Sequence, residues 1–273
     1  MPVSDNLRRL VAAVAPLFAG EAVVFRTYWD WPRRSRETDR LWILRQARKE
    51  VWDTPQGDPR GLYLGPVEDL LSDLPRIDID VPRNDILGRM KTLYEEFSHY
   101  CAFADAHDVL CEGDQPRLSP AMLRQVPDWD ENRAIGARRA EIIANEGAIG
   151  ARACLFTEGG YCTLFSEGMR LAGRGGADDA IAAACALVYE DEFGHMCKGI
   201  VGLDAEGLSP DDWARLTALS VELARLRIAM RNAQFGYPLD AARIKEIHDG
   251  RIEPIQFDFA RAMAGQDSSD GGP

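Results

Sequence analysis

Two short stretches share one pattern and decide how the rest of this chain is interpreted: residues 94–99 (YEEFSH) and residues 192–195 (EFGH). In each stretch a glutamate stands three positions before a histidine, although the 273 residues contain only four histidines. Positions i and i+3 lie on the same face of an α-helix, so each pair can offer one oxygen and one nitrogen to a single metal ion. The repetition therefore predicts two pairs of metal ligands on two helices.

The two predicted pairs are Glu96 with His99 and Glu192 with His195. Around Glu192 and His195 the apolar residues recur with helical spacing, which places both side chains within the buried face of their helix. Glu96 and His99 flank the apolar face of their own helix instead of lying at its centre. That helix must be buried on most of its sides if both residues are to point inward.

Helical periodicity dominates the remaining sequence, and the two-residue alternation typical of strands is nearly absent. We therefore expect an all-α fold, built as one domain over residues 1–263, with a long crossover insert over residues 32–83. The predicted core helices span residues 4–31, 84–110, 130–172 and 178–203; two additional helices span 35–53 and 209–235, and residues 264–273 form a disordered tail.

The overall charge excludes some classes of partner. Lys and Arg number 32 against 44 Asp and Glu, which gives a net charge of −12. Nucleic acid and anionic membrane surfaces both require clustered positive charge, so neither is an expected partner. No apolar run of 18 residues suggests a membrane-spanning helix. The six cysteines form no CxxC motif and fit small buried side chains in a reduced cytoplasm.

A third carboxylate, Glu158, lies at the centre of the apolar face of the predicted helix 130–172. Glu158 precedes the turn at Gly173 by 15 residues, and Glu192 follows Asp178 by 14. At about 1.5 Å per residue the two glutamates are level across a helical hairpin. Glu146 would lie roughly 18 Å too far from the turn by the same rise, so this register favours Glu158.

The fourth carboxylate is expected on the first helix, where Glu21 is centred among apolar residues. Glu21 lies 10 residues before Trp31, and Glu96 lies 12 residues after Asn84, so the two are also roughly level. Glu37 and Glu50 compete for this ligand position. Glu37 better fits compensation of the helix dipole in the first turn, and Glu50 lies near the end of its helix.

Four glutamates and two histidines form a consistent set of ligands, because four carboxylates balance the charge of two divalent cations. A buried carboxylate is costly unless it is neutralised or paired, and a dinuclear metal site would neutralise all four. The predicted metal ligands are Glu21, Glu96, His99, Glu158, Glu192 and His195.

This pattern resembles the ferritin-like superfamily of non-haem di-iron proteins, in which a Glu helix and a Glu-x-x-His helix occur twice. Residues 18–21 (FAGE) and 95–99 (EEFSH) are similar to the first half of a rubrerythrin core, and Glu158 with residues 192–195 (EFGH) to the second. The extra glutamate of rubrerythrin peroxidases is missing, because its position carries Leu155 or Tyr161. The plain set of four glutamates and two histidines resembles that of oxygen-activating members.

The resemblance implies a four-helix bundle holding two iron ions, or one manganese and one iron ion, and an oxidase or oxygenase that uses O2 on a small organic substrate. Tyr94, Tyr161 and Tyr189 lie close to the ligands in sequence and are candidates for contacts behind them. An electron-donor protein and a homodimer are compatible with the sequence, which fixes neither. A ferroxidase and a non-catalytic helical binding protein are the alternatives.

Overall fold

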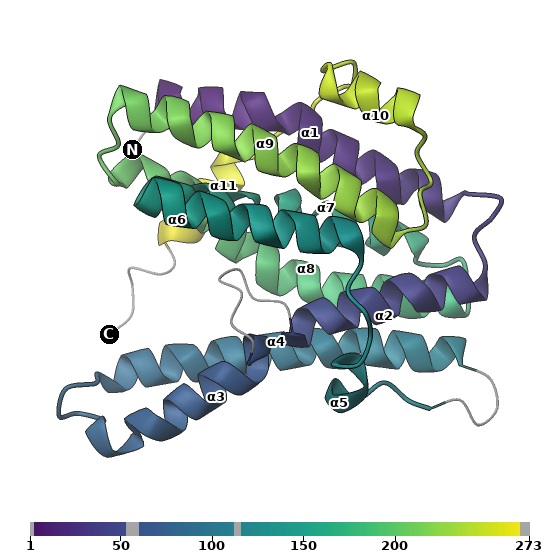
Figure 1. The fold of residues 1–273 in the computed structure, drawn as a ribbon, viewed down its shortest axis with the longest axis horizontal. Helices are drawn as coiled ribbons and strands as arrows, with labels where there is room; N and C mark the ends of the chain where they lie inside the picture. Colours follow the sequence, from purple (N-terminus) through teal and green to yellow (C-terminus); the bar gives the residue numbers. More distant parts are fainter. Residues whose placement is uncertain (1–2, 53–59, 112–115, 268–273) are drawn as a thin grey trace.

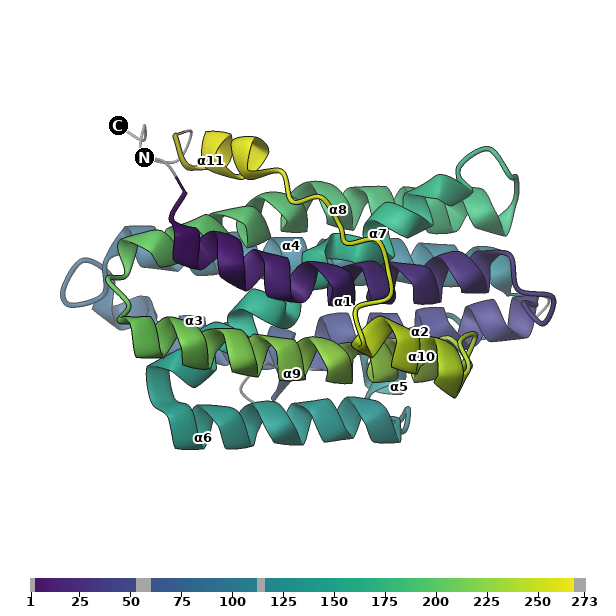
Figure 2. The same cartoon turned by 90° about the horizontal axis from the view of Figure 1, so that it is seen from above.

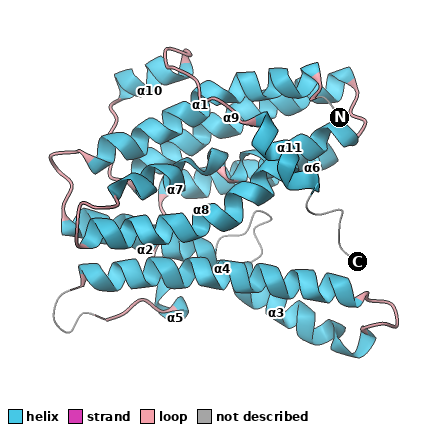
Figure 3. Ribbon diagram, turned by 180° about the vertical axis from the view of Figure 1, so that it is seen from behind, coloured by secondary structure: helices cyan, strands magenta, loops and turns pink. Residues whose placement is uncertain are grey.

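The computed structural model describes residues 3–52, 60–111 and 116–267, and all regular elements in these ranges are helical (Figures 1 and 3). The all-α prediction is therefore confirmed. The long helices are α1 (Asp5–Trp29), α2 (Arg36–Trp52), α4 (Arg83–Leu110), α6 (Asp130–Glu158), α8 (Ala177–Gly202) and α9 (Pro210–Gln234). The shorter ones are α3 (Gly61–Asp73), α5 (Pro120–Leu123), α7 (Thr163–Gly168), α10 (Ala241–His248) and α11 (Phe259–Asp267), with 3-10 turns η1 (Leu74–Arg76), η2 (Gly160–Cys162), η3 (Met169–Leu171) and η4 (Leu203–Ala205).

Several helix starts follow directly from local sequence. The side chain of Ser4 accepts a hydrogen bond from the backbone N–H of Leu7 and so caps α1. At the start of α9, Ser209 and Asp212 form a reciprocal capping box ahead of Pro210 in the first turn. Such caps satisfy backbone N–H groups that have no partner inside the helix.

The long helices form two packed groups (Figures 1 and 2). In the first group, α9 packs between α6 and α1, and α1 packs in turn on α7, which packs on α8. In the second group, α2 packs along α4 and α3 packs against both of them. Helix α8 also packs on α4 and so joins the two groups. The helices that carry the predicted ligands therefore enclose the space between them from several directions.

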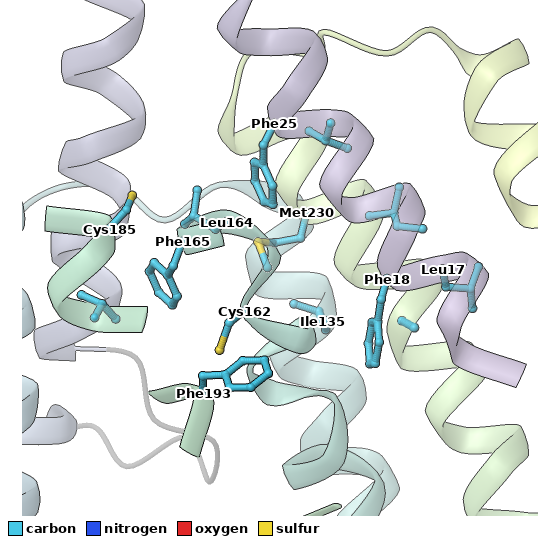
Figure 4. Close-up of a cluster of buried hydrophobic side chains, with 14 of the residues drawn as sticks. Leu17, Phe18, Phe25, Ile135, Cys162, Leu164, Phe165, Cys185, Phe193 and Met230 are labelled. Atoms are coloured by element: carbon cyan, nitrogen blue, oxygen red, sulfur yellow. The ribbon is translucent and has the colours of Figure 1, made fainter. Parts of the chain in front are cut away.

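Helix α2 belongs to the core of the protein. Trp42 is fully buried, and its ring stacks on that of Phe235 with centroids 4.9 Å apart. Tyr28 on α1 donates a hydrogen bond to the buried carboxylate of Asp39, 2.8 Å away. Figure 4 shows another part of the core, where α1 contributes Phe18 and Phe25. The contacts of Trp42 and Asp39 hold α2 against α1 and against the residue that follows α9.

The predicted helix over residues 130–172 is not continuous. Within α6, Gly147 adopts φ 55° and ψ −127°, a conformation available essentially to glycine alone. The chain folds back there, so that Cys154 Sγ lies 3.9 Å from the carbonyl oxygen of Arg139, 15 residues earlier. A second break follows Glu158, where Gly160, Tyr161 and Cys162 all have positive φ before α7 begins. Distances counted along one straight helix were therefore wrong.

Both ends of the chain differ from the sequence-based expectation. Helix α1 is long and apolar enough to pass as a membrane span by length and composition, although 67% of its most apolar stretch is buried, as in a core helix. The predicted tail begins too early, because α11 continues to Asp267. Residues 268–273 lie outside the part of the chain that the structure describes.

Candidate metal centre

Carboxylates from four helices line one cavity of about 870 Å³. They are Glu50 on α2, Glu96 on α4, Glu158 at the last position of α6 and Glu192 on α8. The ligand atoms of Glu50, Glu96 and His99 lie within 4.8 Å of one another, close enough to hold one ion. Glu158 is exposed in the wall of this cavity, where the apolar-face argument predicted that it would be buried. The structure thus brings together three of the four predicted glutamates and adds Glu50.

The carboxylates of this cluster repel one another. Burial, together with the charges of Glu50, Glu192 and Glu158, raises the pKa of Glu96 well above its usual range. Burial, followed by the charges of Glu50 and Glu158, raises the pKa of Glu192 to about 7. Groups with strongly raised pKa values in a cavity are frequent at functional sites. Cations of high charge would remove both the repulsion and the cost of burial.

His99 is held between carboxylates on both sides of its ring. Its side chain is 1% exposed, and its Nδ1 lies 3.9 Å from Glu96 Oε2 and 3.9 Å from Glu192 Oε1. Its Nε2 lies 3.3 Å from Asp191 Oδ2 on α8. A carboxylate behind the far nitrogen of a metal-binding histidine fixes the ring and makes the near nitrogen a better ligand. Asp191 is therefore placed to orient the ring of His99, and only its position beside Glu192 signals it in the sequence.

Glu21 does not join the cluster, which corrects the predicted ligand set. Its side chain is 1% exposed and is held by Arg227 of α9, whose Nε and Nη2 donate to the two carboxylate oxygens at 2.9 and 2.7 Å. Arg231 Nε lies 3.4 Å from the same carboxylate. The cost of burying this charge is offset by arginines instead of a metal.

Glu50 takes the place in the carboxylate cluster that Glu21 was expected to fill. The amide of Gln46, one turn earlier on α2, donates to Glu50 Oε1 at 2.6 Å. The side-chain oxygen of Gln46 accepts a hydrogen bond from Arg231 Nη1 at 2.8 Å. The ion pair of Glu21 with Arg231, together with the hydrogen bonds from Arg231 to Gln46 and from Gln46 to Glu50, therefore links Glu21 to the orientation of Glu50. The other candidate, Glu37, is exposed at the start of α2, where it accepts a hydrogen bond from Ser35.

Arg227 also fixes the end of α6. Its Nη1 donates to the backbone carbonyl oxygen of Glu158, a group left without a partner where the helix stops. Gly160 adopts φ +52° beside this contact, and a Cβ there would lie 2.7 Å from Glu21 Oε2 and would also clash with the guanidinium of Arg227. Glycine at position 160 is required both by the backbone and by this close approach.

Replacing Gly160 by alanine is expected to destabilise the protein by about 1–3 kcal/mol, the range for a strained backbone conformation, because the new methyl group also meets the Glu21–Arg227 pair. Denaturant unfolding of the purified protein measures this change. Gly136→Ala is the matched control, since a Cβ at that helical position meets nothing within 4 Å. Equal stability of the two variants would contradict the close approach at Gly160.

The three tyrosines predicted to lie behind the ligands are placed elsewhere. Tyr94 is 74% exposed on the outer surface of α4. Tyr161 and Tyr189 line a different cavity of about 720 Å³, in which the rings of both pack on Phe193. Sequence proximity failed here because neighbouring positions on a helix point in different directions.

The remaining candidates are placed as follows. His195 lies on α8, three residues after Glu192, and its side chain is outside what the structure describes. Glu146 pairs with Arg215 on α9 beside the turn of α6. A second group of ligand-type side chains, His107, Asp108 and Cys111, gathers at the end of α4, with Cys111 Sγ 3.4 Å from His107 Nδ1.

Comparison with known protein families, with curated proteins and with solved structures finds no match for this chain.

Proposed function

We propose that this protein is a dinuclear non-haem metal enzyme of ferritin-like type, an oxidase or oxygenase that uses O2 to oxidise a small organic substrate. The observation that carries the proposal is the convergence of Glu50, Glu96, Glu158 and Glu192 from four helices on one cavity. Carboxylate-bridged helix bundles take one Glu from each of two helices and a Glu-x-x-His pair from each of the other two. Helices α2, α6, α4 and α8 supply that set.

The donor set suits the proposed metals. Carboxylate oxygens with imidazole nitrogens are ligands that iron and manganese accept, and four glutamates would balance two divalent ions. Glu50, Glu96, His99, Glu158, Glu192 and His195 would hold the pair, two iron ions or one manganese and one iron ion. The chemistry that such a pair supplies when bound is the reductive activation of O2.

Two residues that contact the proposed ligands would hold them in place. Asp191 would hold the imidazole ring of His99, and Gln46 would hold the carboxylate of Glu50, since both contacts are already formed. Apolar side chains of the cavity wall would limit the access of water to the reacting atoms. They are Leu155, Phe156, Phe165, Val188, Met196 and Ile200.

The shape of the cavity favours an organic substrate over the ferroxidase alternative. A volume of about 870 Å³ lies in the usual range for pockets that bind small organic molecules. A route for iron ions alone needs far less space. The non-catalytic alternative, a helical binding protein, leaves four converging carboxylates without a role.

Metal analysis tests the proposal. The purified protein is reconstituted anaerobically with Fe(II), desalted and analysed for metal by mass spectrometry. About two iron ions per chain are expected, as four carboxylates require, and exposure to O2 should then consume O2 and change the visible absorption spectrum. Fewer than about one ion per chain would overturn the proposal. Continued oxidation of many iron ions per chain, with none retained at the site, would favour the ferroxidase.

Matched substitutions test the assignment of Glu158 and His195 as ligands. Glu158→Ala and His195→Ala are each expected to lose at least one of about two metal ions, since each removes a ligand. Glu146→Ala should retain the full metal content because Glu146 is held by Arg215. An equal loss of metal in Glu146→Ala would show that the cavity has been assigned to the wrong carboxylate.

A further inference from the structure

The cavity contains one arginine whose binding edge is not used. Arg139, on the first arm of α6, lines the same cavity as Glu158 and Glu192. Its Nε and Nη2 atoms are buried and have no hydrogen-bond partner among the residues that the structure describes. Buried donors without partners are rare, because each retains the full cost of losing water. A missing ligand is one explanation that can be tested.

The unused edge of Arg139, formed by Nε and Nη2, is the edge with which other arginines of this protein bind carboxylates. Arg227 binds Glu21 through Nε and Nη2 at 2.9 and 2.7 Å. Arg138 binds Glu222 through the same two atoms at 2.6 and 3.2 Å. This side-on geometry matches two parallel N–H donors to the two oxygens of one carboxylate. Arg139 lines the cavity, and the same pair of donors carries no carboxylate among the residues that the structure describes.

The charge balance of the interior also favours an anion. Apart from the four carboxylates of the cluster, the charged side chains that line the cavity are seven arginines, Lys49 and Asp128. Several of these arginines have carboxylate partners, such as Arg152 with Glu206 and Arg227 with Glu21. Two divalent metal ions would neutralise the cluster, and the remaining side chains of the lining would then carry an excess of positive charge. The negative charge of Glu158 favours the charged form of Arg139. Metal binding would engage that carboxylate. An incoming anion would reduce this excess of positive charge.

We propose that Arg139 binds the carboxylate group of the substrate, so that the substrate is a small organic carboxylic acid whose apolar part lies along the cavity wall beside the metal centre. This inference rests on the proposed function for its chemistry, but the binding itself can be measured separately. One carboxylate fits the edge formed by Nε and Nη2. The apolar part of the acid would lie against side chains such as Leu155 and Met196, which line the same cavity.

The test compares matched probes on the full-length protein, both metal-free and reconstituted, by isothermal titration calorimetry. The probes are 3-phenylpropanoate and octanoate, their neutral amides, and 2-phenylethyl phosphate. Each acid is expected to bind about tenfold or more tightly than its amide, the effect of a charged hydrogen-bonded pair in a buried site. Equal binding of acids and amides would overturn the proposal, and so would tighter binding of the phosphate than of either acid.

Substitutions locate the binding group. Arg139→Gln is expected to lose the preference for acids while keeping the metal content of the wild type. Arg152→Gln is the matched control, because Arg152 lines the same cavity but is already bound to Glu206 at 2.8 Å, and it should keep the preference. Retention of the preference in Arg139→Gln would place the carboxylate on the metal ions or on another arginine and would overturn the proposal.

Two further measurements keep the outcome decisive. If Arg139→Gln does not fold by circular dichroism, Arg139→Lys decides, since it keeps the charge but not the two-pronged edge; an undiminished preference for acids would then contradict the proposal. If the wild type takes up no metal, the proposed function fails by itself. The preference for acids of the metal-free protein, and its loss in the Arg139 variants, still decide whether the carboxylate site exists.

Discussion

Replacing Glu50 by alanine is expected to reduce the bound metal from about two ions per chain to one or fewer, because it removes one of four carboxylates that would share two cations. Glu50 lies within 4.8 Å of the ligand atoms of Glu96 and His99, so the loss affects the site directly. Metal content after anaerobic reconstitution and desalting measures the change. The variant should also show no O2-dependent change in its absorption spectrum.

The controls for this substitution come from the two rejected ligand candidates. Glu37→Ala alters an exposed residue at the other end of α2 and should leave the metal content unchanged. Glu21→Gln removes a carboxylate that contacts arginines and should still reach two ions per chain at saturating metal. A full metal complement in Glu50→Ala, combined with a loss in Glu21→Gln, would restore the original choice of ligand and contradict the arrangement seen here.

The sequence predicts the helical class and the starts of several helices, because these depend on local spacing. It also singles out Glu96, His99 and Glu192, which line one cavity. It selected Glu21 for a sound but incomplete reason: a carboxylate centred on an apolar face needs compensation. Whether that compensation comes from a metal ion or from an arginine depends on which helix packs opposite. Arg227 stands 206 residues away from Glu21, and no local pattern reports their contact.

The sequence predicts Glu158 as a ligand from a helix register that the structure does not have. That register requires one straight helix from residue 130 to 172, whereas α6 folds back at Gly147 and ends at Glu158. An isolated glycine within a helical pattern is usually tolerated, so the turn left little trace in the periodicity. Gly159 and Gly160 were the stronger signal, since two consecutive glycines commonly end a helix. The sequence argues against Glu50 as a ligand because Glu50 lies near the end of its helix. No local pattern shows that a cavity lies at that end.

The largest effect on stability is expected at the pair of Glu21 and Arg227. Glu21→Gln should lower the free energy of unfolding by about 3–5 kcal/mol, the cost of leaving a buried charge without its partner. For a chain of this size that corresponds to a fall in melting temperature on the order of 10 °C. Both side chains are almost fully buried, at 1% and 4% exposure, so water cannot replace the lost carboxylate.

The matched control is Glu146→Gln, which breaks the pair with Arg215 at the surface. Surface ion pairs contribute little because solvent screens them, so the melting temperature should stay close to that of the wild type. Changing both members of the buried pair, as Glu21→Leu with Arg227→Met, separates two roles of Arg227. If its only role is to neutralise Glu21, the double variant regains most of the lost stability. If the hydrogen bond from Arg227 to the carbonyl of Glu158 also holds the end of α6, metal affinity falls in the double variant even though stability returns, and that combination is the result we expect.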